Sequence, residues 1–311
     1  MKKIQKKQNS AHLPTILVIL GPTASGKSDL AVKIALKTPQ GAEIISADSR
    51  QVYKGLDIGT GKITKKEMGG IPHHLLDVAS PRTISGQHDR QFTVDRFRKM
   101  AEEKITDILS RGKLPVLCGG TGFYIQSIVD GVVLPDVKAD KKLRSKLSTK
   151  TAPQLFALLK KQDPARAKNI DPQNRVRLIR AIEIAQALGK VPKIKNSPRY
   201  RAVQIGIKPT DKTLHARIHD RLIKRMQQGM VTEARQLHRD GLSWKAMESL
   251  GLEYRYLALF LQKKIQKTEM LHDLEVAIRQ YAKRQMKWFQ RDTRIKWLKD
   301  NKLEYNKIKG L

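Results

Sequence analysis

Short apolar runs alternate with amphipathic segments along the first 137 residues of the chain. TILVIL at 15–20, AEIISAD at 42–48 and KLPVLCGG at 113–120 have the length and composition of buried strands. Helical periodicity follows the first run in DLAVKIALK and precedes the third at about 93–111. Strands that alternate with helices predict an α/β fold, a parallel sheet with helices on both faces.

The pattern changes after Pro135. From about 138 to 200 the chain is helical, strongly basic and without a convincing strand, and AVQIGI at 202–207 restores a strand pattern. We therefore predict a mostly helical insertion over 138–204. Residues 15–137 and 205–311 would form one core, closed by C-terminal helices at about 211–239, 246–263 and 268–291. Residues 1–14 are expected to be a basic arm.

Charge points to the class of partner. The chain carries 62 Lys and Arg against 29 Asp and Glu, a net charge of +33. Residues 1–137 hold +7 of this excess and residues 138–311 hold +26. A charge of this size favours a polyanion such as tRNA or DNA, which should lie mainly against the second half. A solvated basic surface is the plainer alternative.

Cysteine content and hydropathy bear on location. Cys118 is the single cysteine, so the chain can form neither an intramolecular disulfide nor a cysteine metal cluster. This composition fits a reducing cytoplasm. No segment approaches the roughly 18 apolar residues of a membrane helix, and the apolar run at 16–20 is too short for a signal peptide. We expect a cytoplasmic, monomeric protein without a membrane partner.

A phosphate-binding loop follows the first predicted strand. GPTASGKS matches the pattern G-x-x-x-x-G-K-[ST] and lies between a strand and a helix. Its backbone N–H groups would cradle phosphate oxygens, Lys27 would supply a charge, and the Ser28 hydroxyl could ligate Mg²⁺. The predicted diphosphate-binding residues are Gly21, Pro22, Thr23, Ala24, Ser25, Gly26, Lys27 and Ser28.

The loop alone does not identify the reaction, because it can bind a diphosphate whether phosphorus or carbon is attacked. The later strand PVLCGG ends in glycines rather than in a carboxylate, which counts against a motor-type ATPase. Asp48 follows the second predicted strand, at the sheet edge where ligands of open α/β sheets bind. It could act as a general base or cap the next helix, and the residues alone leave both open.

The motifs together resemble one family. GPTASGKS, ISADSRQVYKGLDIGTGK and GGTGFYI, in this order and spacing, are similar to the tRNA dimethylallyltransferases, also called tRNA isopentenyltransferases. The resemblance runs from about residue 15 to 298 and includes PHHLLD at 72–77, NRVRLIRAIE at 174–183, RIHDR at 217–221 and RQYAKRQ at 279–285. It implies transfer of a dimethylallyl group from dimethylallyl diphosphate to the N6 amine of the adenosine 3′ of the anticodon, giving N6-isopentenyladenosine and diphosphate.

The resemblance also implies residue roles. The phosphate loop would hold the diphosphate, with Mg²⁺ through Ser28. Asp48 would be the general base, Thr121 would lie beside the reacting adenosine, and Arg221 would hold the departing diphosphate. The adenosine would be flipped out of its stack, because a stacked base hides its amine. The expected tRNA contacts are Asp48, Ser49, Arg50, Gln51, Thr121, Arg144, Arg177, Arg180, Lys283, Arg284 and Gln285.

The predicted last helix carries a basic stripe. Arg279, Lys283, Lys287 and Arg291 recur at spacing four, which suits phosphate contact, whereas an exposed basic face is the alternative. The segment LGLEYR at 250–255 departs from the family's usual Gly-Tyr-[Lys/Arg]-Glu pattern. Three other functions remain to be tested: prenyl transfer to free AMP, ADP or ATP, a small-molecule kinase, and an RNA-binding module with a vestigial loop.

Overall fold

The computed structural model describes residues 13–81 and 92–299. The predicted basic arm at 1–14 therefore lies almost wholly outside the described residues. The chain divides into two compact units, one containing residues 13–81, 92–131 and 198–299, and the other containing residues 132–197. No helix in these ranges is both long and apolar enough to cross a membrane.

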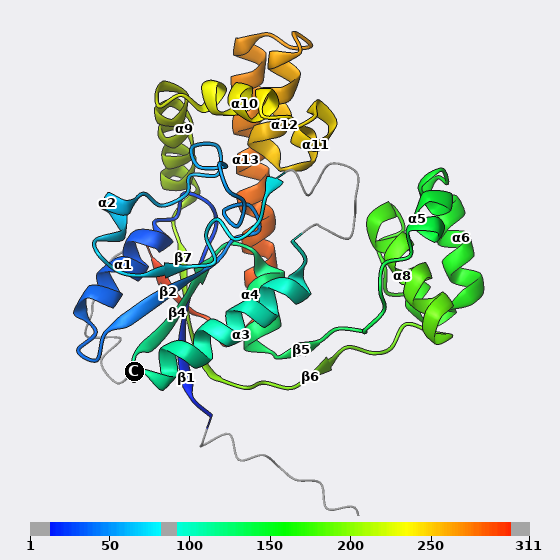
Figure 1. The fold of residues 1–311 in the computed structure, drawn as a ribbon, viewed down its shortest axis with the longest axis horizontal. Coiled ribbons are helices and arrows are strands. Elements are labelled where there is room, and N and C mark those ends of the chain that lie inside the picture. The colour runs from blue at the N-terminus through cyan, green and yellow to red at the C-terminus, as the bar shows by residue number, and fades with distance from the viewer. Residues whose placement is uncertain (1–12, 82–91, 300–311) are drawn as a thin grey trace, which may run out of the picture. The chain divides into compact units, whose positions relative to one another are not determined.

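The first unit is built on a parallel sheet (Figure 1). Its strands lie in the order β3-β2-β4-β1-β7-β8. Their bounds are β1 Thr15–Leu20, β2 Ala42–Ala47, β3 His73–His74, β4 Leu114–Gly119, β7 Arg201–Lys208 and β8 Lys296–Lys299. The register pairs Leu20 with Gly119 and Ala47 with Gly119, so the carboxyl ends of β1, β2 and β4 meet at one edge. The predicted α/β fold with a parallel sheet core is confirmed.

Helices cover both faces of this sheet. Alternate residues of β1 enter two separate cores, as the pleat of a strand requires. Leu17 and Ile19 pack in the cluster that includes α1 (Lys27–Lys37), whereas Ile16 and Val18 pack in the cluster of α3 (Val94–Ser110) and α4 (Gly122–Val129). The short helix α2 (Lys65–Met68) has no buried residue.

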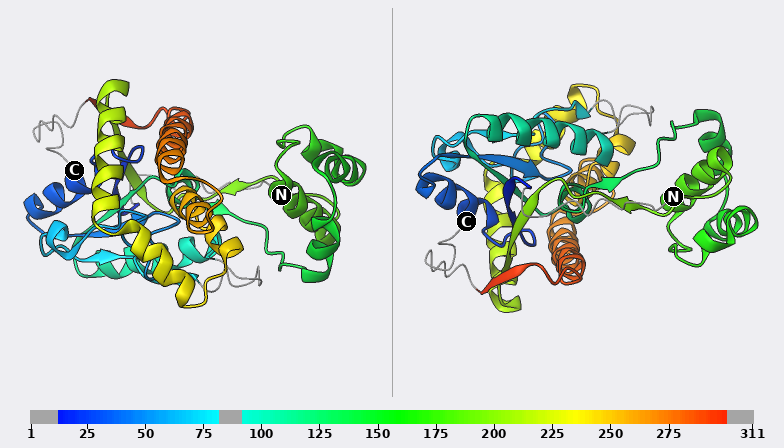
Figure 2. Two further views of the ribbon diagram at one scale, coloured as in Figure 1. Left: turned by 90° about the horizontal axis from the view of Figure 1, so that it is seen from above. Right: turned by 90° about the horizontal axis from the view of Figure 1, so that it is seen from below.

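The C-terminal helices complete the first unit (Figure 2). They are α9 Asp211–Gln227, α10 Met230–Arg239, α11 Trp244–Ser249, α12 Leu252–Leu261 and α13 Lys267–Phe289. The helix predicted over 211–239 is broken at Gly229 (φ 99°), and the one over 246–263 is broken at Gly251 (φ 148°). Glycine reaches these left-handed conformations without a Cβ clash, so each periodic pattern contains two helices instead of one.

The second unit has a core of its own. It contains the antiparallel pair β5 (Val132–Val133) and β6 (Lys195–Asn196). Its helices are α5 Lys141–Ser148, α6 Ala152–Gln162, α7 Pro164–Ala167 and α8 Arg175–Leu188, which bury a small apolar cluster. The unit begins at Val132 and ends at Ser197, earlier than the predicted 138 and 204. Its two-residue strands are too short to leave a sequence pattern, and they carry the chain into and out of the unit.

Candidate active site

The phosphate loop joins β1 to α1. It turns through Ala24 (φ 60°) and Gly26 (φ 86°), and such left-handed turns aim successive backbone N–H groups into one concavity. A Cβ on Gly21 would lie 2.9 Å from Ser25 Oγ and 3.0 Å from the Ile207 carbonyl oxygen, so the first position has no room for a side chain. Lys27 Nζ donates to the Pro22 carbonyl at 3.2 Å, folding back across the loop.

Lys27 stands among other charges. Desolvation lowers its pKa, Arg221 and Arg225 lower it further, and the Asp48 carboxylate opposes them. Each of these groups is therefore close enough to act electrostatically on the lysine. Positive charge gathered away from water is stabilised by an incoming anion, as the proposed diphosphate would be.

Helix α9 directs three arginines toward this site. Arg217 Nη1 donates to the Ser25 carbonyl at 3.4 Å, Arg221 Nη2 to the Gly61 carbonyl at 3.0 Å, and Arg225 Nη1 to the Gly59 carbonyl at 3.3 Å. Desolvation and the neighbouring Arg225 lower the pKa of Arg221 to about 10.

The two inner arginines differ in their partners. Arg225 forms an ion pair with Glu253 at 3.4 Å, whereas Arg221 pairs with no carboxylate among the residues that the structure describes. A guanidinium has five N–H donors, so Arg221 keeps donors for an anion. Arg225 was missed from the sequence. Its recurrence four residues after Arg221 was the available signal.

Asp48 caps a turn at the end of β2. Its Oδ1 accepts the N–H groups of Arg50 at 2.8 Å and Gln51 at 3.2 Å. No helix follows, since residues 49–52 form turns. Within the described ranges no hydrogen bond reaches its second oxygen, Oδ2. The carboxylate also acts electrostatically on Lys27 and Arg221. The capping hydrogen bonds therefore occupy Oδ1 alone, and the general-base role of Asp48 stays a prediction.

Thr121 connects the Asp48 turn to β4. Its Oγ1 accepts the Ser49 N–H at 3.0 Å, and its own N–H donates to the Ala47 carbonyl at 3.2 Å. Thr121 is also the N-cap residue of α4. It therefore lies beside Asp48 at the carboxyl edge, where the resemblance expects the reacting adenosine.

Gln51 and Arg50 make contacts within the protein. Gln51 accepts from Ser46 Oγ at 3.4 Å and donates through Nε2 to the Gly61 carbonyl at 3.2 Å. Arg50 lies against Gly251, where a Cβ would stand 3.4 Å from its Nε. The departure at 250–255 thus packs directly on one of the predicted tRNA contacts.

Gln285, one of the predicted tRNA contacts, makes hydrogen bonds within the protein. Its buried side chain accepts the Thr23 N–H at 2.9 Å through Oε1 and donates to the Gly120 carbonyl at 2.8 Å through Nε2. The amide therefore joins the phosphate loop to the turn formed by Gly119, Gly120 and Thr121, here called the GGT turn. Lys283 and Arg284 are exposed, as a surface contact requires, and the Arg284 guanidinium lies 5.9 Å from the Tyr281 ring centroid.

Two further predicted tRNA contacts hold the second unit together. Arg144 binds Glu183 through Nε at 2.8 Å and Nη2 at 2.7 Å, and Arg180 binds both Glu183 and the Val137 carbonyl. Burial alone would raise the pKa of Glu183, but hydrogen bonds from the two arginines lower it. A buried carboxylate needs such partners, which explains why these side chains turn inward. Arg177 is exposed.

The predicted metal contact lies in the phosphate loop. Among residues 13–81 and 92–299, no group of three or more His, Cys, Asp or Glu side chains could hold a metal ion. Ser28, half-buried at the start of α1, is the predicted metal contact. One hydroxyl suits an ion that takes its remaining oxygens from phosphate and water.

Comparison with known proteins gives a consistent result. The family model described as "IPP transferase" matches residues 51–292. The chain is 41% identical over 294 residues to tRNA dimethylallyltransferase 2 of Citrifermentans bemidjiense, covering 93% of this chain and 92% of that protein. It is 39% identical to the tRNA dimethylallyltransferase of Staphylococcus aureus, covering 92% of each chain.

Solved structures agree. The tRNA isopentenylpyrophosphate transferase from Bacillus halodurans superposes with a TM-score of 0.69 at 34% identity, covering 94% of this chain and 92% of that one. A eukaryotic dimethylallyltransferase acting on tRNA gives a TM-score of 0.78 at 26% identity, covering 93% and 74%. The resemblance predicted from the motifs is confirmed, and the chain belongs to the IPP transferase family.

Proposed function

We propose that this protein transfers the dimethylallyl group of dimethylallyl diphosphate to the N6 amine of the adenosine 3′ of the tRNA anticodon. The observation that carries the proposal is a pair of opposed charges at one sheet edge. Lys27 and Arg221 form a desolvated cationic site at the phosphate loop, and the Asp48 carboxylate acts electrostatically on both. N-alkylation by a diphosphate ester requires a cationic site that stabilises the leaving anion and a base that accepts the proton.

The reaction balances with these groups. The N6 nitrogen forms a bond to the first carbon of the prenyl group, whose bond to oxygen breaks. Diphosphate leaves with that electron pair, and Asp48 accepts the N6 proton. Lys27, Arg221 and the loop N–H groups stabilise the charge that develops on the departing oxygen. The Thr121 hydroxyl accepts a hydrogen bond from the Ser49 N–H and so positions the turn that carries Asp48.

The Ser28 hydroxyl would hold Mg²⁺, which would supply positive charge opposite the departing diphosphate. The loop supplies the remaining contacts through its own backbone. Thr23 cannot add its N–H to the anion site, because Gln285 already accepts it.

The tRNA is expected on exposed basic side chains. Arg177, Lys283 and Arg284 are exposed, and residues 138–311 hold +26 of the net charge. Ser49 and Arg50 lie beside Asp48 and would contact the flipped adenosine and its neighbours. The names of the relatives favour tRNA over free AMP, ADP or ATP. We propose that the enzyme acts as a monomer in the cytoplasm.

Radiolabelled dimethylallyl diphosphate tests the proposal directly. The protein is incubated with Mg²⁺ and either unmodified tRNA or AMP, ADP or ATP, and the nucleosides are analysed. Label in N6-isopentenyladenosine from tRNA alone supports the proposal. Label in the free nucleotides would assign an adenylate prenyltransferase, and ATP-dependent phosphorylation without prenyl transfer would assign a kinase. Binding of tRNA without either product would leave an RNA-binding module.

A further inference from the structure

We propose that Glu233 is a positioning residue for the diphosphate site, although it lies outside the phosphate loop. It would act by fixing the segment Asp57–Gly61, here called the backbone hook, whose last carbonyl orients Arg221. The inference rests on the proposed function, because it assumes that Arg221 holds the diphosphate.

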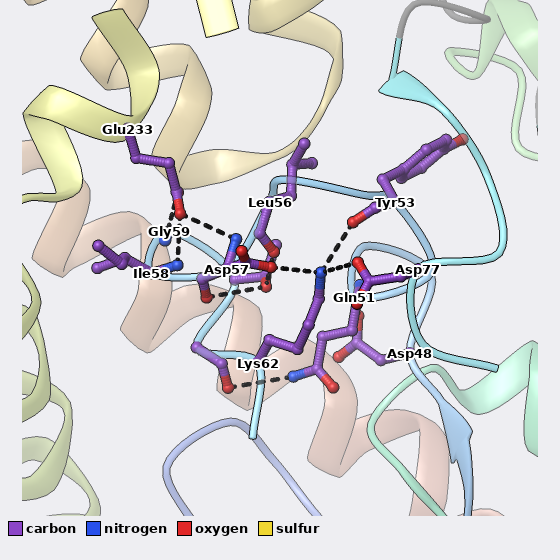
Figure 3. Close-up of polar contacts among 12 residues, drawn as sticks. Asp48, Gln51, Tyr53, Leu56, Asp57, Ile58, Gly59, Lys62, Asp77 and Glu233 are labelled. Atoms are coloured by element: carbon purple, nitrogen blue, oxygen red, sulfur yellow. Dashed lines mark hydrogen bonds and ion pairs between the residues drawn. The ribbon is translucent and has the colours of Figure 1, made fainter. Parts of the chain in front are cut away.

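One carboxylate collects four donors. Glu233 Oε2 accepts the N–H groups of Asp57 at 3.0 Å and Ile58 at 2.7 Å (Figure 3). Its Oε1 accepts the Gly59 N–H at 2.9 Å and the Tyr254 hydroxyl at 2.7 Å. Burial, then the nearby Glu233, raises the pKa of Tyr254 well above its usual value, so the hydroxyl keeps its proton and donates. Three successive backbone N–H groups converging on one anion fix the course of a loop.

Close packing leaves the backbone hook no alternative path. A Cβ on Gly59 would stand 2.7 Å from the Tyr254 ring. A Cβ on Gly61 would stand closer still to the guanidinium groups of both Arg221 and Arg225. The arginines therefore lie directly against the backbone of this segment, and a shift of the segment would move them.

The far end of the backbone hook is anchored separately. Lys62 Nζ donates to the Tyr53 carbonyl at 2.9 Å and contacts Asp57 at 2.6 Å and Asp77 at 2.5 Å, with 6% of its side chain exposed (Figure 3). This anchor holds the segment after Gly61. Glu233 holds the segment before it, so the Gly61 carbonyl is fixed from both sides.

The Gly61 carbonyl connects the backbone hook to Arg221. It accepts Arg221 Nη2 at 3.0 Å and Gln51 Nε2 at 3.2 Å. No carboxylate pairs with Arg221 among the described residues, so this carbonyl is its hydrogen-bond partner there. Glu233 thus reaches Arg221 through the backbone hook, and Arg221 touches the diphosphate. Misplacing a binding group by about 1 Å can cost on the order of 10²-fold in rate.

Glu233→Gln tests the proposal. The variant keeps the shape of the side chain, but it replaces one acceptor oxygen with an NH₂ group that faces N–H or O–H donors. Asp240→Asn is the matched control, because Asp240 follows α10 and its carboxylate accepts, from the part of the chain that the structure describes, only the exposed Gln236 side chain. The affinity for inorganic pyrophosphate with Mg²⁺, the affinity for tRNA, and the kcat and KM for dimethylallyl diphosphate are measured. We expect Glu233→Gln to weaken pyrophosphate binding and kcat/KM by roughly tenfold or more with tRNA affinity unchanged.

A double-mutant cycle separates positioning from general damage. In an Arg221→Ala background the effect of Glu233→Gln on pyrophosphate affinity should fall to about twofold or less, because the residue it orients is gone. An undiminished effect in that background, or wild-type affinity in folded Glu233→Gln, overturns the proposal. If Glu233→Gln does not fold, Tyr254→Phe serves instead: it removes one donor to Glu233 and should weaken pyrophosphate binding only when Arg221 is present.

Failure of the underlying function gives a different result. Wild-type protein that neither binds pyrophosphate nor modifies tRNA would overturn the proposed function itself. Weakened pyrophosphate binding in Arg221→Ala with normal binding in Glu233→Gln would overturn the positioning role alone.

Discussion

The side-chain oxygen of Gln285 lies 2.9 Å from the backbone nitrogen of Thr23, its partner in the phosphate loop 262 residues earlier. The same amide donates to the Gly120 carbonyl at 2.8 Å. One side chain of α13 therefore links the phosphate loop to the turn that leads to Thr121. Gln285 therefore helps to set the geometry of the candidate site, and its contact with tRNA stays a prediction.

Replacing Gln285 by Leu should lower kcat by about 10- to 100-fold while leaving tRNA affinity unchanged, because the loop and the GGT turn lose their common partner. The unpaired Thr23 N–H and Gly120 carbonyl should also reduce stability by about 1–3 kcal/mol each. Steady-state kinetics, tRNA binding and thermal denaturation measure these effects. Reduced tRNA affinity at normal kcat would instead support the predicted contact of Gln285 with tRNA.

Asp48→Asn separates two roles of one carboxylate. Asparagine keeps an oxygen that can accept the Arg50 and Gln51 N–H groups, but it cannot take a proton from the N6 amine. We expect turnover to fall by roughly 10²–10⁴ with tRNA affinity and stability near wild type. Asp48→Ala removes both roles and should lose stability as well. A single-turnover rate near wild type in Asp48→Asn would refute the general-base assignment.

The glycine after Thr121 is required by packing. A Cβ on Gly122 would lie 2.2 Å from Cδ1 of Trp288 on α13. Gly122→Ala should therefore destabilise the protein by about 1–3 kcal/mol through overpacking, as thermal denaturation would report. Combining it with Trp288→Leu should recover part of the loss. Additive destabilisation in the double variant would show that the ring is not the obstacle.

Salt dependence distinguishes surface cations from structural ones. Lys283→Ala should weaken tRNA binding and reduce the slope of log affinity against log salt by about 1. Arg180→Ala should chiefly destabilise the second unit, because it removes a partner of the buried Glu183. Binding titrations over a range of salt, with a melting curve for each variant, separate the two. An equal change of slope in both variants would support the predicted contact of Arg180 with tRNA.

Acid stability should depend on Asp292. Hydrogen bonds from Arg294 lower the pKa of Asp292 from 3.8 to about 2, and Gln204 donates to it at 3.0 Å. A carboxyl whose pKa is lower in the folded state stabilises the protein when the pH is above the unfolded-state pKa. This stabilisation is lost as the pH falls from about 4 to about 2. Asp292→Asn should therefore cost about 1 kcal/mol at neutral pH, a small value because Arg294 is largely exposed. The difference in denaturant unfolding should vanish near pH 2.

Local patterns predicted the elements that carry their own signal. The strands at 15–20, 42–48 and 113–120, the phosphate loop and the last helix all lie within a few residues of their predicted bounds. Strands β8 and β3 are too short to leave a sequence pattern, and pairing with neighbouring strands places them in the sheet. Gln285, Glu233 and Arg225 act through contacts with residues far away in the chain, and such contacts depend on the fold. The sequence likewise could not show that Arg144 and Arg180 bind the buried Glu183, because this contact also depends on the fold.

The Thr23–Gln285 hydrogen bond also sets an order of assembly. The phosphate loop leaves the ribosome well before α13, because 262 residues separate Thr23 from Gln285. A nascent or truncated chain that ends before α13 would leave the Thr23 N–H without this partner, although the Lys27 motif would be intact. The loop can therefore reach its secured conformation only after α13 has been synthesised.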